Sequence, residues 1–237
     1  MKSDAYSAYF TAEYMMGPNS VRLLDSLLET CPLQLQPGAK VMDIGCGTGL
    51  TSMFLAKETG ADVTALDWWI DAEDNRRRLA AWGLADRVTP VHGDATQMRF
   101  APEAYDAVIS VDAYHYFGGK EGFFAAQILP CVKKGGTVLI AIPGIRNEFD
   151  AQGGELLAPW LGDEADLFRS ANQWKQIIGT HENIESVHTW EMPVFELAWQ
   201  EWFDSKHRFA MGDLAHYDAV IHPYTCFVGI AVRKREK

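Results

Sequence analysis

Short apolar runs and amphipathic stretches alternate along most of the chain. Apolar, β-rich runs bounded by Gly or Pro predict strands, which fall at 40–44, 62–66, 88–92, 106–111 and 137–142. Apolar residues at helical spacing predict helices between them, near 51–59, 70–82 and 119–133. Strands that alternate with helices in this way form a parallel sheet with right-handed crossovers. The pattern therefore predicts an α/β fold whose ligand binds at the carboxyl ends of the strands.

Further elements flank this core. Before it, Ser20 to Thr30 has the pattern of an amphipathic helix, and Asn19 is its expected N-cap. After it, the pattern predicts a helix near 171–179, a strand near 184–191, a helical insertion near 195–211 and a last strand near 226–232. No internal repeat or Pro/Ser-rich linker divides the 237 residues, so we expect a single domain.

The first predicted strand runs directly into a glycine-rich turn. Residues 41–49 are Val-Met-Asp-Ile-Gly-Cys-Gly-Thr-Gly, and a helix is predicted to follow from Leu50. The three glycines remove every Cβ that would keep a ligand off the backbone, and the helix N-terminus offers unpaired N–H groups. A dinucleotide-binding turn spaces its glycines G-x-G-x-x-G, so the earlier third glycine counts against NAD.

The turn resembles the first motif of the class I S-adenosylmethionine-dependent methyltransferases, in their small-molecule, ubiquinone-biosynthesis-like branch. That motif has an acidic residue two positions before its first glycine, as Asp43 is placed here. The resemblance covers roughly residues 38 to 142. It implies a set of cofactor contacts in the turn, namely Asp43, Gly45, Cys46, Gly47 and Gly49.

Two more carboxylates and a paired-glycine turn follow in the family's order. Asp67 ends the second predicted strand, and an ionised carboxylate can accept hydrogen bonds from both hydroxyls of a ribose. Asp94 follows the third strand, and the resemblance implies that it receives the adenine amino group, with Ala95 beside it. Residues 129–138 resemble the lead-in to the family's fifth strand. Each acid alone has an alternative as a helix cap, but the ordered set favours cofactor binding.

The resemblance also implies an architecture and a cofactor. The family fold is Rossmann-like, with a doubly wound seven-stranded sheet, mostly parallel with an antiparallel last strand, and helices on both faces. In this scheme residues 1–37 form an N-terminal lid and helix, 38–142 the cofactor-binding core, and 143–237 the substrate-side insertions and closing strands. The implied cofactor is S-adenosylmethionine, and the product is S-adenosylhomocysteine.

Candidate chemistry lies in the loop after the fourth strand. Methyl transfer from a sulfonium needs alignment and exclusion of water, and a base when the acceptor is protonated. His115 is the candidate base, because its imidazole titrates near neutrality and a His in this loop faces the pocket in similar methyltransferases. Asp112 is a candidate for binding the cofactor's ammonium or an acceptor amine, and Tyr114 and Tyr116 for lining the pocket. Each has an alternative in which it only packs against its neighbours.

This loop and the residues after the next strand each exclude one group of relatives. Methylases of exocyclic base amines carry Asn/Asp-Pro-Pro-aromatic here, whereas this chain has Asp112-Ala113-Tyr114. Magnesium-dependent catechol-type relatives need a second acidic pair after the next strand, and residues 140–144 offer no oxygen-rich cluster. We therefore expect no metal.

Aromatic side chains outside the motifs are candidates for the cofactor and acceptor walls. Trp68 directly follows Asp67 and is a candidate adenine contact. Tyr14, within a possible lid over residues 6–17, and Trp199 are candidates for acceptor binding, since aromatic faces attract cations. Trp199 also belongs to an apolar stripe at helical spacing, which is an alternative indication of core packing.

Charge and cysteine usage narrow the class of partner. The chain has 21 basic and 32 acidic residues, a net charge of −11 that opposes approach to nucleic acid. Its 4 cysteines are widely spaced, which indicates reduced thiols. Because no apolar signal core and no run of ~20 apolar residues occurs, we expect a cytoplasmic protein without a membrane partner. The oligomeric state stays open.

The sequence therefore predicts methyl transfer from S-adenosylmethionine to an oxygen or nitrogen of a small-molecule acceptor. Three alternatives remain: methylation of a protein or tRNA group, a non-catalytic S-adenosylmethionine-binding module, and an NAD-linked oxidoreductase on the same type of sheet.

Overall fold

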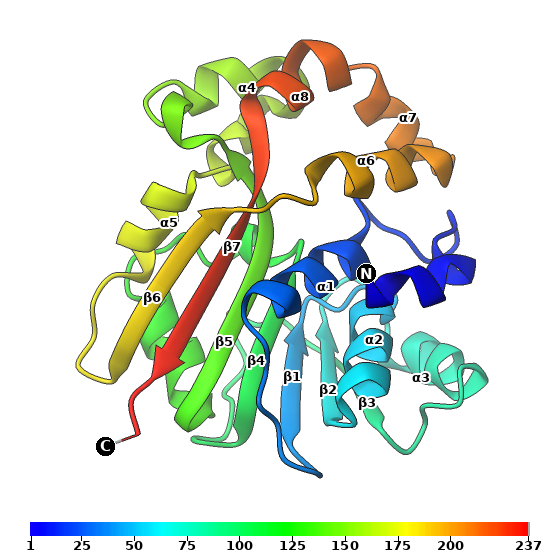
Figure 1. The fold of residues 1–237 in the computed structure, drawn as a ribbon, viewed down its shortest axis with the longest axis vertical. Helices are drawn as coiled ribbons and strands as arrows, with labels where there is room; N and C mark the ends of the chain where they lie inside the picture. The colour runs from blue at the N-terminus through cyan, green and yellow to red at the C-terminus, as the bar shows by residue number, and fades with distance from the viewer. Residues whose placement is uncertain (237) are drawn as a thin grey trace.

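The protein is built around a seven-stranded sheet, seen in a computed structural model that describes residues 1–236 (Figure 1). The strand order is β3-β2-β1-β4-β5-β7-β6. The strands are β1 (Lys40–Ile44), β2 (Asp62–Asp67), β3 (Val88–His92), β4 (Tyr105–Val111), β5 (Val132–Ile145), β6 (Ile184–Glu191) and β7 (Thr225–Lys234). Strands β1 to β5 are parallel, and β7 is antiparallel to both β5 and β6. The predicted α/β fold with its antiparallel last strand is confirmed.

Helices connect the strands and extend beyond the sheet. The α-helices are α1 (Ser20–Thr30), α2 (Leu50–Thr59), α3 (Ala72–Ala81), α4 (Gly153–Leu161), α5 (Ala171–Ile178), α6 (Phe195–Asp204), α7 (Arg208–Leu214) and α8 (His222–Tyr224). Shorter 3₁₀ or π turns are η1 (Lys2–Tyr9), η2 (Tyr114–Tyr116), η3 (Phe124–Ile128), η4 (Leu129–Cys131), η5 (Asn147–Phe149), η6 (Gly162–Leu167) and η7 (Tyr217–Ile221). Across residues 1–236, none of the helices has both the length and the apolar character needed to cross a bilayer.

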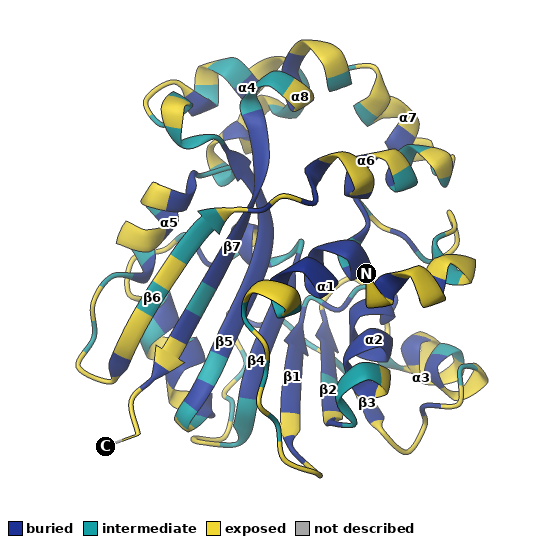
Figure 2. Cartoon of the chain, viewed as in Figure 1, coloured by how far each residue is buried: buried dark blue, intermediate teal, exposed yellow. Residues whose placement is uncertain are grey.

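Both faces of the sheet are buried. Successive side chains of a strand point to opposite faces. In β1, Val41 packs in the cluster that includes α1, α2 and α6, whereas Met42 packs in a second cluster that includes η3 and α5. Figure 2 shows the central strands buried, whereas exposed residues lie on the outer sides of the helices, in the loops and along the edge strand β6. Burial on both faces explains why these strands read as continuous apolar runs.

The order of the strands places the site. From β1 the chain continues to β2 on one side, and β4 then pairs with β1 on its other side. Such a reversal leaves a crevice at the carboxyl ends of the two central strands, where α/β proteins bind ligands.

Three segments differ from the sequence prediction. The helix expected over 119–133 is only the irregular pair η3 and η4, because Gly122 has φ +76° and Pro130 lacks an N–H. The insertion expected over 195–211 divides into α6 and α7 at Lys206, whose φ is +56°. Helix α4 was not predicted.

Candidate active site

The glycine turn after β1 is held in a conformation that only glycine adopts readily. Gly45, Gly47 and Gly49 have φ of +74°, +53° and +90°. A Cβ built on Gly45 would lie 2.2 Å from the Ala113 Cβ, and one on Gly47 would lie 2.9 Å from the Met16 Sδ. The turn therefore packs closely against the β4 loop and the N-terminal segment, and its backbone stays bare.

A cavity of about 310 Å³ lies over this turn. Its walls come from the turn, the ends of β2 and β4, the loop after β3 and the N-terminal segment. Ten of the sequence-predicted site residues line it: Tyr14, Gly45, Cys46, Gly47, Asp67, Trp68, Asp94, Ala95, Asp112 and Tyr116. Five do not line it: Asp43, Gly49, Tyr114, His115 and Trp199.

Asp67 organises two backbone segments at the cavity. Its Oδ2 accepts a hydrogen bond from the Gly47 N–H at 2.8 Å. Its Oδ1 accepts from the N–H groups of Trp69 and Ile70, at 2.7 and 2.8 Å. A carboxylate offers about four acceptor sites, so these three bonds leave one site for a ligand hydroxyl. If two of the N–H groups share one site, two sites are left. The side chain thus fixes the glycine turn and still faces the cavity.

Asp94 and Trp68 form the wall beyond β2 and β3. Asp94 Oδ1 accepts from the N–H and hydroxyl of Thr96, at 2.8 and 2.7 Å. The Trp68 ring is 59% exposed and stacks on His92 with ring centroids 5.7 Å apart. A large exposed indole beside a cavity is a binding surface for a planar, apolar group.

Asp112 contributes a third carboxylate to the cavity wall. It directly follows β4 and has a left-handed φ of +55°. A Cβ on Gly17 would lie 2.4 Å from its Oδ2, so the carboxylate packs against the N-terminal segment. Burial, with a smaller contribution from the negative charge of Asp213, raises the pKa of Asp112 from 3.8 to about 7. A strained residue with a raised pKa in a cavity is a candidate proton acceptor at neutral pH.

Asp43 lies beneath the glycine turn. It is fully buried, and its Oδ2 accepts hydrogen bonds from the hydroxyls of Thr51 and Ser52, both at 2.6 Å. Burial raises the pKa of Asp43 to about 6, although the two hydroxyls oppose the shift. Since these partners belong to α2, Asp43 ties the end of β1 to that helix from outside the cavity lining.

His115 is buried behind the cavity wall. Its ring is 2% exposed and lies 4.0 Å from the Tyr116 ring and 5.7 Å from the Phe168 ring, between centroids. Burial lowers the pKa of His115 to about 3, so the imidazole is neutral and only weakly basic. The sequence argument relied on titration near neutrality, and the structure removes that premise.

Tyr114 and Trp199 are core residues. Tyr114 is 1% exposed and packs against Phe117 and Trp174. Trp199 is 3% exposed and stacks on Phe227, which agrees with the packing alternative for its apolar stripe. Neither side chain belongs to the cavity lining.

Sequence reasoning missed several cavity residues. Thr48 lines the cavity, and its hydroxyl donates to the Tyr14 carbonyl at 2.6 Å. Met16 and Gly17, which belong to the expected N-terminal lid over residues 6–17, line the cavity as well, and so does Pro18 just after that segment. Nothing in the local sequence pattern singled out Thr48 or Pro18 as a cavity residue.

The sequence and the fold are similar to those of known methyltransferases. Residues 41–136 match the sequence profile of a family described as "Methyltransferase domain". A sterol 24-C-methyltransferase of Yarrowia lipolytica is 32% identical over 119 residues, which are 49% of this chain and 30% of that protein. The chain spans less than half the length of the curated relatives it matches.

Solved structures share the fold over most of the chain. Phosphoethanolamine N-methyltransferase 2 of Haemonchus contortus, in complex with S-adenosylmethionine, has a TM-score of 0.67 at 20% identity and covers 98% of this chain and 56% of its own. Geranyl diphosphate C-methyltransferase of Streptomyces coelicolor has a TM-score of 0.67 at 14% identity, with coverages of 89% and 78%.

Proposed function

Because the chain carries a class I S-adenosylmethionine-dependent methyltransferase domain, we propose that it methylates a small-molecule amine at nitrogen. The observation that carries this proposal is the cavity itself. It joins the bare turn at Gly45 and Gly47 with three carboxylates, Asp67, Asp94 and Asp112, at the ends of neighbouring strands.

The residues present fit the family's cofactor. A bare backbone at Gly47, a carboxylate at Asp67 with acceptor capacity to spare, and the exposed Trp68 ring suit an adenosine with its ribose diol. Asp94 suits an exocyclic amino group, because its acceptor oxygens lie at the same edge of the sheet. When bound, S-adenosylmethionine supplies an electrophilic methyl group on a positively charged sulfur.

Asp112 is assigned the acceptor side of the reaction. Its carboxylate attracts an ammonium, and its pKa of about 7 lets it take up the proton that the ammonium must lose before nitrogen can act as a nucleophile. The aromatic rings of Tyr116 and Trp69, both at the cavity, add attraction for a cation and exclude water. We therefore transfer the proposed base from His115 to Asp112.

A second candidate is methylation of an apolar acceptor. Trp68, Trp69, Tyr116 and Met16 are 44–64% exposed at the cavity, and they form an apolar rim on a strongly acidic protein. Such a rim suits a prenyl or sterol-like molecule. Two of the proteins similar to this chain are named for carbon methylation of a sterol and of geranyl diphosphate.

The decisive experiment combines cofactor titration with a methyl-transfer assay. Calorimetric titration with S-adenosylmethionine, and competition by NAD, measures which cofactor binds. S-adenosylhomocysteine release is then measured over a panel of amines, phenols, carboxylates, prenyl diphosphates and sterols. We expect the highest turnover with amines and its loss in Asp112→Asn.

Each other outcome has a definite meaning. Turnover only with prenyl or sterol acceptors would replace the amine proposal by the second candidate. Binding without turnover on any acceptor, including peptides and tRNA, would indicate a non-catalytic module. Tight NAD binding that displaces S-adenosylmethionine would indicate an oxidoreductase.

A further inference from the structure

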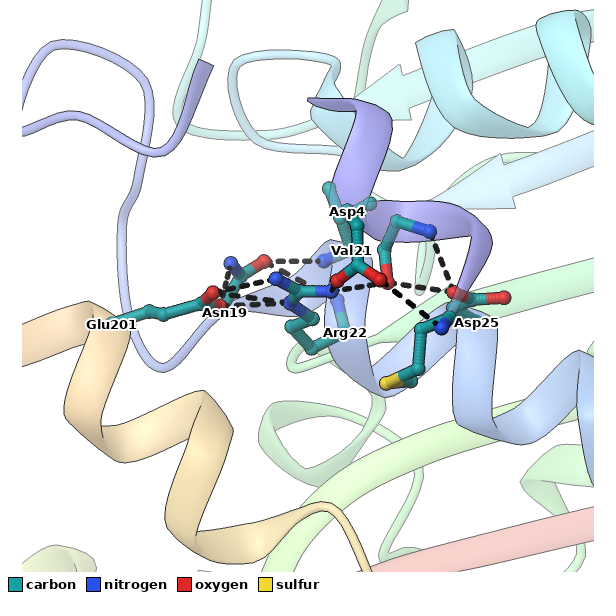
Figure 3. A network of polar contacts seen from close by, with 8 residues as sticks. Asp4, Asn19, Val21, Arg22, Asp25 and Glu201 are labelled. Carbon is teal, nitrogen blue, oxygen red and sulfur yellow. Dashed lines mark hydrogen bonds and ion pairs between the residues drawn. The ribbon is translucent and has the colours of Figure 1, made fainter. Parts of the chain in front are cut away.

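A buried arginine lies at the junction of three segments that are distant in sequence (Figure 3). The Arg22 side chain, on α1, is only 6% exposed. It donates to both carboxylate oxygens of Glu201 on α6, with Nη2–Oε1 at 2.7 Å and Nε–Oε2 at 3.0 Å. Its Nη1 donates to the Ser3 hydroxyl at 2.9 Å and also pairs with the Asp4 carboxylate, both on η1.

Neighbouring hydrogen bonds reinforce the junction. Ser3 donates from its N–H and its hydroxyl to Asp25 Oδ2, at 2.7 and 2.6 Å. Asn19 caps α1 with its Oδ1, and its Nδ2 donates to Glu201 Oε2 at 2.6 Å. The Asn19 N–H donates to the Ala198 carbonyl of α6 at 3.0 Å. The three segments are therefore joined by charged hydrogen bonds, which are stronger than neutral ones.

The segment between these anchors forms part of the cavity wall. It runs from η1 to the Asn19 cap and includes Tyr14, Met16, Gly17 and Pro18, which line the cavity. Both of its ends are held by Arg22, since Ser3 and Asp4 lie before it and Asn19, through Glu201, after it. Its middle is attached by the bond from Thr48 to the Tyr14 carbonyl and by the Tyr6 hydroxyl, which donates to Glu58 at 2.6 Å.

We propose that Arg22 is a positioning residue for methyl transfer, which fixes the N-terminal cavity wall and links it to α6. Arg22 does not line the cavity, so it acts on ligands only through the segment that it holds. Without the planar guanidinium of Arg22, the two ends of the N-terminal segment can open locally while the sheet stays folded. Cofactor affinity then decreases, because binding must also order the segment. The kinetic part of this proposal rests on the proposed function.

The test uses Arg22→Lys, which keeps the positive charge but loses the guanidinium group that bonds Glu201 through two nitrogens. We expect amide hydrogen exchange over residues 10–18 to speed up roughly tenfold, because the loss of one charged hydrogen bond lowers the free energy of local opening of this segment by a corresponding amount. The amides of β1 should stay protected. The KM for S-adenosylmethionine should rise about tenfold, with kcat changed less than about threefold. The matched control is Arg87→Lys, an exposed arginine that donates to the Gly60 carbonyl.

Other results would overturn the proposal. Unchanged exchange over residues 10–18, or a fall in kcat at constant KM, contradicts a positioning role for Arg22. If Arg22→Lys fails to fold, Glu201→Gln gives the same readout with a smaller expected effect, because Asp4 and Ser3 still hold the guanidinium. Hydrogen exchange needs no turnover, so failure of the proposed enzyme activity leaves this test decisive.

Discussion

Asp67→Asn separates the structural role of Asp67 from its proposed contact with the ribose. The Asn oxygen can keep the bonds from the N–H groups of Trp69 and Ile70, but its NH₂ group then faces the Gly47 N–H, where Oδ2 now accepts at 2.8 Å. The diol also loses its charged acceptor. A hydrogen bond to a charged group is worth roughly 1.5–3 kcal/mol, and the Asn oxygen is already occupied by the two N–H groups, so the loss of one or two such bonds should cost about 2–4 kcal/mol of cofactor binding.

This cost corresponds to a ~30- to ~1,000-fold weaker Kd for S-adenosylmethionine, measured by isothermal titration calorimetry. Thermal unfolding of the protein without cofactor measures the structural role of Asp67. We expect the free energy of unfolding to fall by about 1–2 kcal/mol, because one contact, at Gly47, is disturbed. Asp71→Asn is the matched control, because Asp71 caps α3 through a 2.7 Å bond from the Glu73 N–H and does not line the cavity. A Kd for Asp67→Asn within threefold of the unaltered protein, together with a lowered melting temperature, would refute the ribose assignment and leave Asp67 a purely structural residue.

Three further substitutions test other parts of the site. Folding raises the pKa of Asp112 from 3.8 to about 7, so ionisation of its carboxylate lowers the free energy of unfolding. This loss of stability is complete above pH 7 and disappears as the pH falls toward 3.8. Asp112→Asn should therefore melt at a higher temperature than the unaltered protein near pH 8, with a smaller difference near pH 5, and lose ~100-fold or more in kcat with an amine; equal melting temperatures at both pH values would contradict the raised pKa. His115→Phe should keep kcat within about threefold, since a buried imidazole with a pKa near 3 is too weak a base to accept the proton at neutral pH. A ~100-fold fall in kcat at unchanged cofactor affinity would restore His115 as the base. Gly45→Ala should lower the free energy of unfolding by at least ~1–2 kcal/mol, because alanine is strained at the positive φ of this position. The new Cβ would also clash with the Cβ of Ala113, which adds to this loss. An unaltered denaturant midpoint would argue against this close packing.

The local pattern predicted most of the sheet. Strands β1, β3 and β6 begin and end where the sequence placed them, because each is a short apolar or alternating run bounded by breakers. The Asn19 cap and the helix after it were also predicted correctly, since both depend on residues next to each other in the chain. The irregular 119–133 segment was not, because glycines and a proline within it outweigh its helical spacing.

The site residues also fall into two groups, those that the sequence could locate and those that it could not. The glycine turn, Asp67 and Asp94 could be located from sequence because parallel strands bring consecutive strand ends to one edge of the sheet. The pattern could not show whether His115 or Asp112 faces the cavity, since both follow β4 within a few residues. Segments distant in the chain contribute to both shifts: Phe168 packs against the His115 ring, and the negative charge of Asp213 adds to the effect of burial on the pKa of Asp112.

The sequence by itself determined the order of the elements, the turn and the class of cofactor, because these depend on local spacing and on strand ends that meet by topology. Only the tertiary structure decided which side chains line the cavity and that Arg22 joins the N-terminal segment to α6. Such contacts join residues up to 182 positions apart, and no local propensity encodes them.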